Sequence, residues 1–243
     1  MPESNRITIK NIARQRFSVL REGEPVGTVE LYDNPLHARH SYLRLALSEY
    51  DGTVAAELFD LLAKAAGKPL QAMLPSDDTE LAAFLTAGGF ILKRRCFETE
   101  AGREDLLPEA LALPLPAISV CRTGETEYRE CCMLLYDYYR AAHEAVSPLT
   151  ADYRSFCERL PETALFCAAD GRIVHAAFIE ANELAYIASA EPLNVRPFAC
   201  AAAEYLFREH RRIFFECDDC DAAAMALRSL FRHDEESFDT YVR

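Results

Sequence analysis

The order of apolar segments repeats along this chain, and this repeat restricts the possible folds more than any other feature of the sequence. The first half shows a strand, a helix, a short buried strand and a second helix, at 42–47, 53–66, 70–74 and 79–87. The second half shows the same segments in the same order, at 184–189, 197–210, 213–217 and 221–230. Strands that alternate with helices indicate parallel strands joined by crossover helices, and a period of this length indicates a duplicated unit.

The segments around the two repeats predict how the chain divides into domains. Alternating strands fill 6–47, whereas a strand at 118–121, helices at 125–145 and 150–160 and a hairpin at 164–180 precede the second repeat. Between them, Leu107-Pro and Leu113-Pro-Leu-Pro remove backbone donors and favour extended chain. We therefore predict a domain at 1–100, a proline-rich linker at 101–117 and a domain at 118–243. The fold class is α/β (α+β), with mixed, mostly antiparallel sheets around a strand–helix–strand–helix core.

Charge and composition exclude several classes of function. The formal net charge of -13 would repel nucleic acid and anionic membranes, but it tolerates a cationic partner such as an amine. No apolar run approaches the roughly 20 residues that a bilayer requires, and the first ten residues do not resemble a signal peptide. The nine cysteines are an odd number and lie mostly in apolar patterns, which favours reduced core thiols. We expect a cytoplasmic monomer or homodimer.

Residues 118–243 resemble the GNAT (N-acetyltransferase) superfamily element by element: strand, two helices, three antiparallel strands, helix, strand, helix, strand. The family signature Q/R-x-x-G-x-G/A corresponds to Arg196-Pro-Phe-Ala199-Cys-Ala201, with alanine in place of the central glycine. The later pattern N-x-x-A-x-x-L-Y is met from Asp221 to Leu227, but Arg228 replaces the tyrosine. The first half matches more weakly, with Glu49-Tyr-Asp-Gly52 at the signature. The resemblance implies two GNAT-like domains in tandem, the first of them truncated.

This resemblance implies acetyl-CoA as the cosubstrate, and charge favours the second domain as its site. A helix N-terminus binds a diphosphate through its N–H groups and dipole. Arg196 adds a positive charge at that place, whereas Glu49 and Asp51 would oppose an anion in the first half. The expected cofactor residues are Ile187, Ala188, Ser189, Arg196, Pro197, Phe198, Ala199, Cys200, Ala201 and Asp221.

The resemblance also places the chemistry of acetyl transfer. The base that takes the proton of the amine is expected to be Glu183, or as a second candidate Glu216. Because the family tyrosine is missing at Arg228, the candidates for the acid are Tyr186 and, as the alternative, Tyr205. Aromatic and titratable side chains of the first long helix would line the acceptor site: Tyr136, Tyr139 and His143. Solvated strand-end glutamates and core tyrosines would produce the same sequence pattern.

The expected function is direct transfer of an acetyl group from acetyl-CoA to a small amine or a peptide amine. The alternative is a non-catalytic acyl-CoA-binding or protein-interaction module on the same scaffold. A third reading rests on Cys217-Asp-Asp-Cys220, since two such thiols can bind zinc or carry out redox chemistry. Zinc would need two further ligands, and the sequence has no second pair of this kind. We therefore expect no metal site.

Overall fold

The computed structural model describes residues 7–233 and 236–243, and it divides them into two compact units. Unit 1 comprises the described residues up to Arg95 together with Ala145–Thr150 and Phe238–Arg243. Unit 2 comprises Cys96–Glu144 and the described residues of Ala151–Ser237. Among the described residues, no helix has both the length and the apolar character needed to cross a bilayer.

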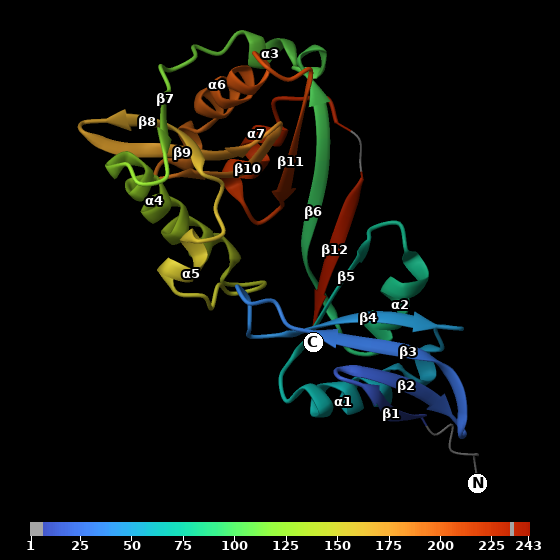
Figure 1. The fold of residues 1–243 in the computed structure, drawn as a ribbon. Helices are drawn as coiled ribbons and strands as arrows, with labels where there is room; N and C mark the ends of the chain where they lie inside the picture. Colours follow the sequence, from blue (N-terminus) through green and yellow to red (C-terminus); the bar gives the residue numbers. More distant parts are fainter. Residues whose placement is uncertain (1–6, 234–235) are drawn as a thin grey trace. The chain divides into compact units, whose positions relative to one another are not determined.

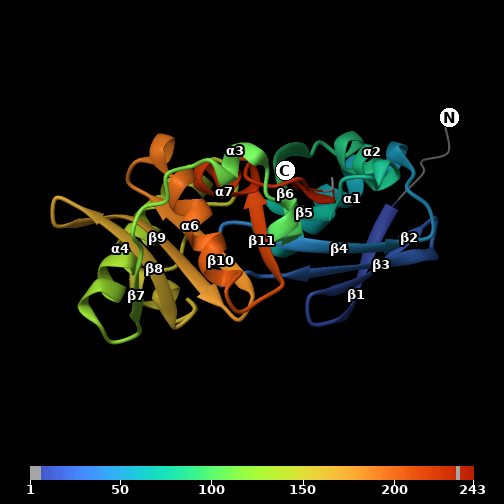
Figure 2. The ribbon, with the colours of Figure 1, turned by 90° about the horizontal axis from the view of Figure 1, so that it is seen from above.

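Unit 1 is built on a mixed sheet whose strand order is β1-β2-β3-β4-β5-β12. Its strands are β1 (Ile7–Ala13), β2 (Arg16–Arg21), β3 (Glu24–Tyr32), β4 (Ser41–Leu47), β5 (Leu70–Pro75) and β12 (Ser237–Val242). Among the strand pairs described for this unit, only β4 and β5 are parallel, and the crossover helix α1 (Gly52–Ala66) joins them. A second helix, α2 (Thr79–Ala87), follows β5. Figure 2 shows α1 and α2 on the same side of β3 and β4.

Aromatic side chains fill the core between these helices and the sheet. Phe59 of α1 is fully buried, and its ring centroid lies 5.3 Å from that of Phe84 and 4.7 Å from that of Phe90. The helix ends where Gly67 adopts a left-handed conformation (φ 69°) and donates its N–H to the carbonyl of Ala63. The turn returns the chain directly into the buried strand β5.

Two segments from the second half of the sequence complete unit 1. The last strand, β12, pairs antiparallel with β5 from Phe238 opposite Pro75 to Val242 opposite Gln71. The segment 145–150 is held by Thr150, whose N–H donates to the Leu36 carbonyl at 2.8 Å. The predicted assignment of both segments to the second domain therefore differs from the units observed. Strand pattern alone does not show which neighbour a strand takes.

Unit 2 contains the second crossover and two layers of helices. Its strand order is β6-β11-β10-β9-β8-β7, and only β10 and β11 are parallel. The strands are β6 (Ile91–Gly102, from Cys96 onward), β7 (Ser119–Arg122), β8 (Thr163–Ala169), β9 (Arg172–Glu180), β10 (Glu183–Ser189) and β11 (Arg212–Asp218). The helices are α3 (Pro108–Leu111), α4 (Thr126–His143), α5 (Tyr153–Cys157), α6 (Arg196–Leu206) and α7 (Ala222–Arg228). Figure 1 shows α4 and α5 on one side of β9 and β10, with α6 and α7 on the other.

The mixed, mostly antiparallel α/β fold with its strand–helix–strand–helix segments is confirmed. The predicted linker at 101–117 is not observed as a separate linker. Ala101, Leu106 and Ala110 are buried in the core of unit 2, and Leu106 forms a bridge with Phe231. Prolines mark where regular structure ends, but the apolar side chains between them still pack against α6 and α7.

Candidate functional site

The two parallel strands of unit 2 separate almost as soon as they meet. Among the described residues, β10 and β11 pair at one position, Glu183 opposite Phe214. Immediately after it, β10 carries an irregularity against β9 between Leu184 and Tyr186. Residues 187–189 therefore keep their pairing with β9 but have no strand partner on the β11 side. A strand edge of this kind presents backbone donors and acceptors to a ligand.

The helix that follows β10 begins without a side-chain cap. No side chain accepts a hydrogen bond from the first N–H groups of α6, and no acidic residue lies in its first turn. Arg196 is exposed and makes no hydrogen bond or ion pair with the described part of the chain. Pro197 is half-buried, whereas Phe198, Ala199, Cys200 and Ala201 are buried in the core. Any contact with a cofactor here would come from the backbone and Arg196.

The start of α7 is closed by protein groups. Asp221 accepts the N–H groups of Ala223 and Ala224, both at 3.0 Å, and the hydroxyl of Tyr138 donates to it at 2.6 Å. Burial raises the pKa of Asp221, although these donors oppose the effect. Asp221 is thus a helix cap, and the cofactor-binding role predicted for it remains a prediction.

The three candidate catalytic residues lie within electrostatic range of one another on the α4 side. Burial raises the pKa of Tyr186, and the charges of Glu183 and Glu216 raise it further. Burial also raises the pKa of Glu183, with Glu180 as a second cause. A buried tyrosine that keeps its proton can act as an acid, and a carboxylate with a raised pKa is a stronger base than an ordinary one.

The structure connects two of the three predicted acceptor residues to this group. The ring of Tyr139 stacks on that of His143 at 3.9 Å between centroids and meets the Tyr186 ring edge-on at 6.1 Å. Tyr136 lies on the α5 side of the helix, where its hydroxyl donates to the Ala151 carbonyl at 3.2 Å. We therefore place Tyr139 and His143 beside the candidate site and Tyr136 in the packing between α4 and α5.

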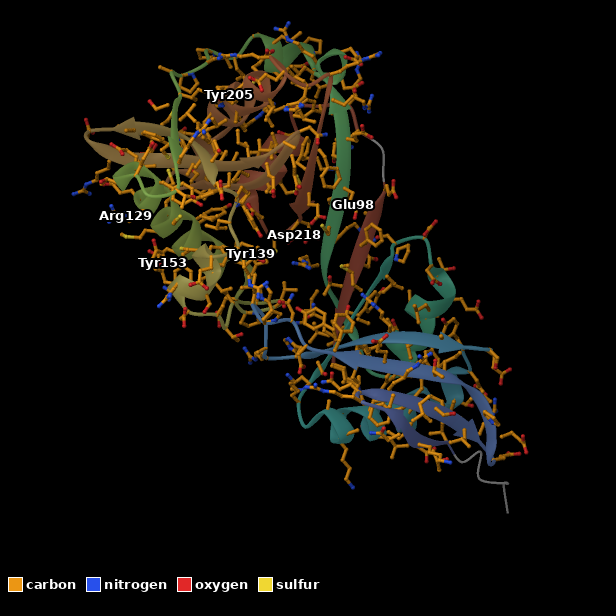
Figure 3. All side chains as sticks on the ribbon, viewed as in Figure 1. Glu98, Arg129, Tyr139, Tyr153, Tyr205 and Asp218 are labelled. Carbon is orange, nitrogen blue, oxygen red and sulfur yellow. The ribbon has the colours of Figure 1, made fainter. Side chains whose placement is uncertain are left out.

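The structure adds two residues that the sequence analysis did not place here, Asp218 and Cys220. His143 Nε2 lies 3.0 Å from Asp218 Oδ2, and its Nδ1 lies 2.9 Å from the Tyr139 carbonyl oxygen. The ligand atoms of His143, Asp218 and Cys220 all lie within 4.8 Å of one another. Figure 3 shows Tyr139 and Asp218 in this region, with Tyr205 of α6 on the other side of the strands. The available signal was the acidic run that follows the carboxyl end of a parallel strand, where ligands commonly bind.

The two thiols of the C-x-x-C pair point to different environments. Cys217 is fully buried, and its Sγ donates to the Ala224 carbonyl at 2.9 Å. Burial raises its pKa far above the ordinary value. Cys220 is half-buried beside His143 and Asp218. The pair therefore does not form a two-thiol chelate.

Arg228, which stands where the family pattern has tyrosine, is buried. Its guanidinium carbon lies 3.9 Å from the centroid of the Phe97 ring, a cation–π contact. The guanidinium cannot release a proton at physiological pH, so it cannot replace the tyrosine as a proton donor.

Comparisons with known proteins identify the fold. A GCN5-related N-acetyltransferase from Sphaerobacter thermophilus matches with a TM-score of 0.55 and 11% identity, over 96% of this chain and 82% of that chain. One from Kribbella flavida matches with a TM-score of 0.52 and 18% identity, over 94% and 90%. A functionally unknown conserved protein from Staphylococcus epidermidis matches with 0.55 and 11%, over 90% of both chains.

No protein-family model matches the sequence, and no curated protein is significantly similar to it. At identities of 11% and 18%, these structural matches establish the fold alone. These matches cover 90% or more of this chain, in which the parallel strands β10 and β11 separate and β10 is irregular. The chain has the fold of the GCN5-related N-acetyltransferases, the GNAT superfamily.

Proposed function

We propose that this protein is an acyl-CoA-dependent N-acyltransferase that moves an acetyl group from acetyl-CoA to an amine. The observation that carries the proposal is the β10–α6 junction. The unpaired end of β10 is followed, after the 3₁₀ turn Pro192–Asn194, by a helix N-terminus that has no side-chain cap and begins with the exposed Arg196. Helix N-termini favour anions through their N–H groups and dipole. This arrangement suits the diphosphate of coenzyme A.

The cofactor would follow β10 from that junction toward the position where β10 and β11 meet. Its diphosphate would contact Arg196 and the first N–H groups of α6. Its pantetheine arm would bond to the backbone of 187–189, along the edge that β11 leaves unpaired. The thioester would then approach Tyr186 and Glu183.

The chemistry requires one proton to leave the amine and one to reach the sulfur. The amine nitrogen attacks the thioester carbonyl carbon, and the tetrahedral intermediate collapses by breaking the carbon–sulfur bond. Glu183 would accept the amine proton, and Tyr186 would donate its proton to the leaving thiolate. Activity should fall as the pH falls through the raised pKa of Glu183, because a protonated carboxyl group cannot act as a base.

Calorimetric titration of coenzyme A into the Arg196→Glu variant tests the cofactor site. Reversing a charge at the diphosphate should weaken binding by about tenfold or more, roughly 1.4 kcal/mol. The Glu49→Ala variant is the matched control in unit 1 and should bind as the wild type does. Unchanged affinity of the Arg196 variant would refute the assignment.

A second candidate function is a non-catalytic acyl-CoA-binding module. The burial of Arg228 over Phe97 favours it, since no proton donor stands at that position of α7. Measuring thiol release from acetyl-CoA with a panel of amines separates the two candidates. Binding without turnover would support the module, whereas amine-dependent release supports the enzyme.

A further inference from the structure

Three side chains of different chemical types meet at the end of β11, and one of them, His143, also lies beside the candidate acceptor site. His143 comes from the last turn of α4, Asp218 is the last residue of β11, and Cys220 lies in the loop before α7. A backbone bond from Asp221 N–H to the Asp218 carbonyl, 2.9 Å long, closes this loop. The turn brings the Cys220 thiol back toward His143 and Asp218.

The orientation of the His143 ring is fixed in a way that is typical of metal ligands. A carbonyl oxygen can only accept, so the 2.9 Å contact with Tyr139 places a proton on Nδ1. The ring is also stacked on Tyr139 and fully buried. Nε2 and the Asp218 carboxylate lie 3.0 Å apart, so a proton lies between them in the metal-free protein, and a metal ion would take its place. A hydrogen bond such as the one from His143 Nδ1–H to the Tyr139 carbonyl orients the ring of metal-binding histidines in many proteins.

From these contacts we infer that His143, Asp218 and Cys220 form a binding site for a divalent metal ion of the zinc type. Nitrogen, carboxylate oxygen and thiolate sulfur are the usual ligands of zinc. Around a tetrahedral ion such ligand atoms lie about 3.3 to 3.6 Å apart. The observed spacings run from 3.0 Å to at most 4.8 Å, a range that includes these values.

The site would join the end of α4 to the loop that precedes α7. Three protein ligands leave one position of a tetrahedral ion for water or for a carboxylate or thiol of a small molecule. The carboxyl group of Asp221, which interacts electrostatically with His143, favours a cation at this place. The inference does not depend on acyl transfer, and coenzyme A binding can be measured separately on the metal-free protein.

Metal binding by the full chain tests the site. The protein is purified without chelators or a histidine tag, stripped with a chelator, and titrated with Zn²⁺ against a coloured competitor and with Co²⁺ in the spectrophotometer. We expect one ion per chain and a cobalt–thiolate charge-transfer band. The Cys220→Ser variant should lose this band, and Asp218→Asn should weaken binding by about tenfold or more.

Two matched controls and one alternative make the result decisive. Asp219→Asn removes an exposed neighbouring charge, and Cys157→Ser removes a thiol from α5; both should bind the ion as the wild type does. A plain imidazolium–carboxylate pair would also explain the 3.0 Å contact, but it would bind no stoichiometric metal. Absence of binding by the wild type, or a cobalt band that persists in Cys220→Ser, overturns the inference. If Cys220→Ser fails to fold, the wild-type cobalt spectrum and Asp218→Asn decide.

Discussion

The two crossovers of this molecule have the same order of elements but opposite chemistry at the helix N-terminus. In unit 1 the carboxylate of Asp51 accepts the N–H of Thr53 at 2.8 Å, and Arg21 bonds to both Asp51 and Glu49 at 2.7 Å. In unit 2 no side chain caps α6, and Arg196 is exposed. The start of α1 is occupied by the protein's own carboxylate, whereas the start of α6 has no side-chain cap among the described residues. The same order of elements therefore carries different charges at the two helix starts.

The two units also differ in how far their parallel strands pair. In unit 1, β4 and β5 pair at two positions, Ser41 opposite Leu70 and Tyr42 opposite Gln71. In unit 2 the corresponding pair has a single position, and β10 is irregular directly after it. The unpaired part of β10 is therefore one residue longer than that of β4. Our proposal that unit 2 binds the cofactor rests mainly on the difference between the two helix starts.

The largest expected effect concerns the candidate base of unit 2. Replacing Glu183 by Gln removes the proton acceptor and should lower kcat/KM for acetyl transfer by about 10²–10⁴-fold. The pH profile should lose its acidic limb, because that limb reports the raised pKa of Glu183. Steady-state assays across pH measure both effects. Glu49→Gln in unit 1 is the control, and an equal loss there would erase the distinction between the units.

Large core side chains should be costly to remove in both units, although the packing differs. Phe59→Ala in unit 1 should lower the free energy of unfolding by about 3–5 kcal/mol, and Leu206→Ala in unit 2 by about 2–5 kcal/mol. Both side chains are nearly or fully buried. Chemical denaturation measures the change. A cost below about 1 kcal/mol at either position would show that its packing differs from the structure described.

The place of the last strand in unit 1 can be tested at Asp239. Its buried carboxylate accepts from Arg95 at 2.6 and 2.9 Å and from Ser76 at 2.8 Å. Asp239→Ala should lower the free energy of unfolding at neutral pH by about 1–3 kcal/mol. Hydrogen exchange in β5 should increase, because β5 pairs with β12.

The pH dependence of this effect has a definite sign. The hydrogen bond from Arg95 lowers the pKa of Asp239 below 3.8, so its contribution is present at neutral pH and is lost as the pH falls through the folded-state pKa. The difference between wild type and Asp239→Ala should therefore shrink in strong acid. A difference independent of pH would contradict the assigned ion pair.

The smallest expected effect is at the cap of α1. Asp51→Ala removes the acceptor for Thr53 N–H and one partner of Arg21, so the melting temperature should fall slightly. Asp51→Asn is the matched control, since asparagine also caps helices, and it should retain most of the stability. A gain of coenzyme A binding in Asp51→Ala would show that unit 1 is closed to the cofactor only by this side chain.

Local patterns were sufficient for most of the fold. Apolar periodicity predicted the crossover helices α1 and α6, and α2 was predicted with its observed bounds, Thr79–Ala87. Strand partners were not predictable in the same way. The residues of β12 do not indicate that this strand pairs with β5, because the pairing depends on which sheet edges distant segments of the chain leave open. For the same reason, the sequence did not predict that apolar side chains of residues 101–117 pack into the core of unit 2.

The sequence predicted only those residues of the candidate site that lie close together along the chain. Glu183, Tyr186 and Arg196 were found because they lie on or next to one strand. Asp218 and Cys220 were not placed with His143, because 75 residues separate His143 from Asp218 and only the packing of α4 brings them together. The sequence spacing suggested that Cys217 and Cys220 act as a pair. Alternation along β11 turns the Cys217 thiol to the core, whereas the loop after the strand places Cys220 beside His143 and Asp218.

A crystal structure with acetyl-CoA bound is the most direct measurement of the central claim, that unit 2 alone binds the cofactor. We expect the diphosphate at the first turn of α6, within hydrogen-bonding distance of Arg196, and the pantetheine arm along residues 187–189. Diphosphate density beside Gly52 at the start of α1, or none in either unit at saturating acetyl-CoA, would contradict the account.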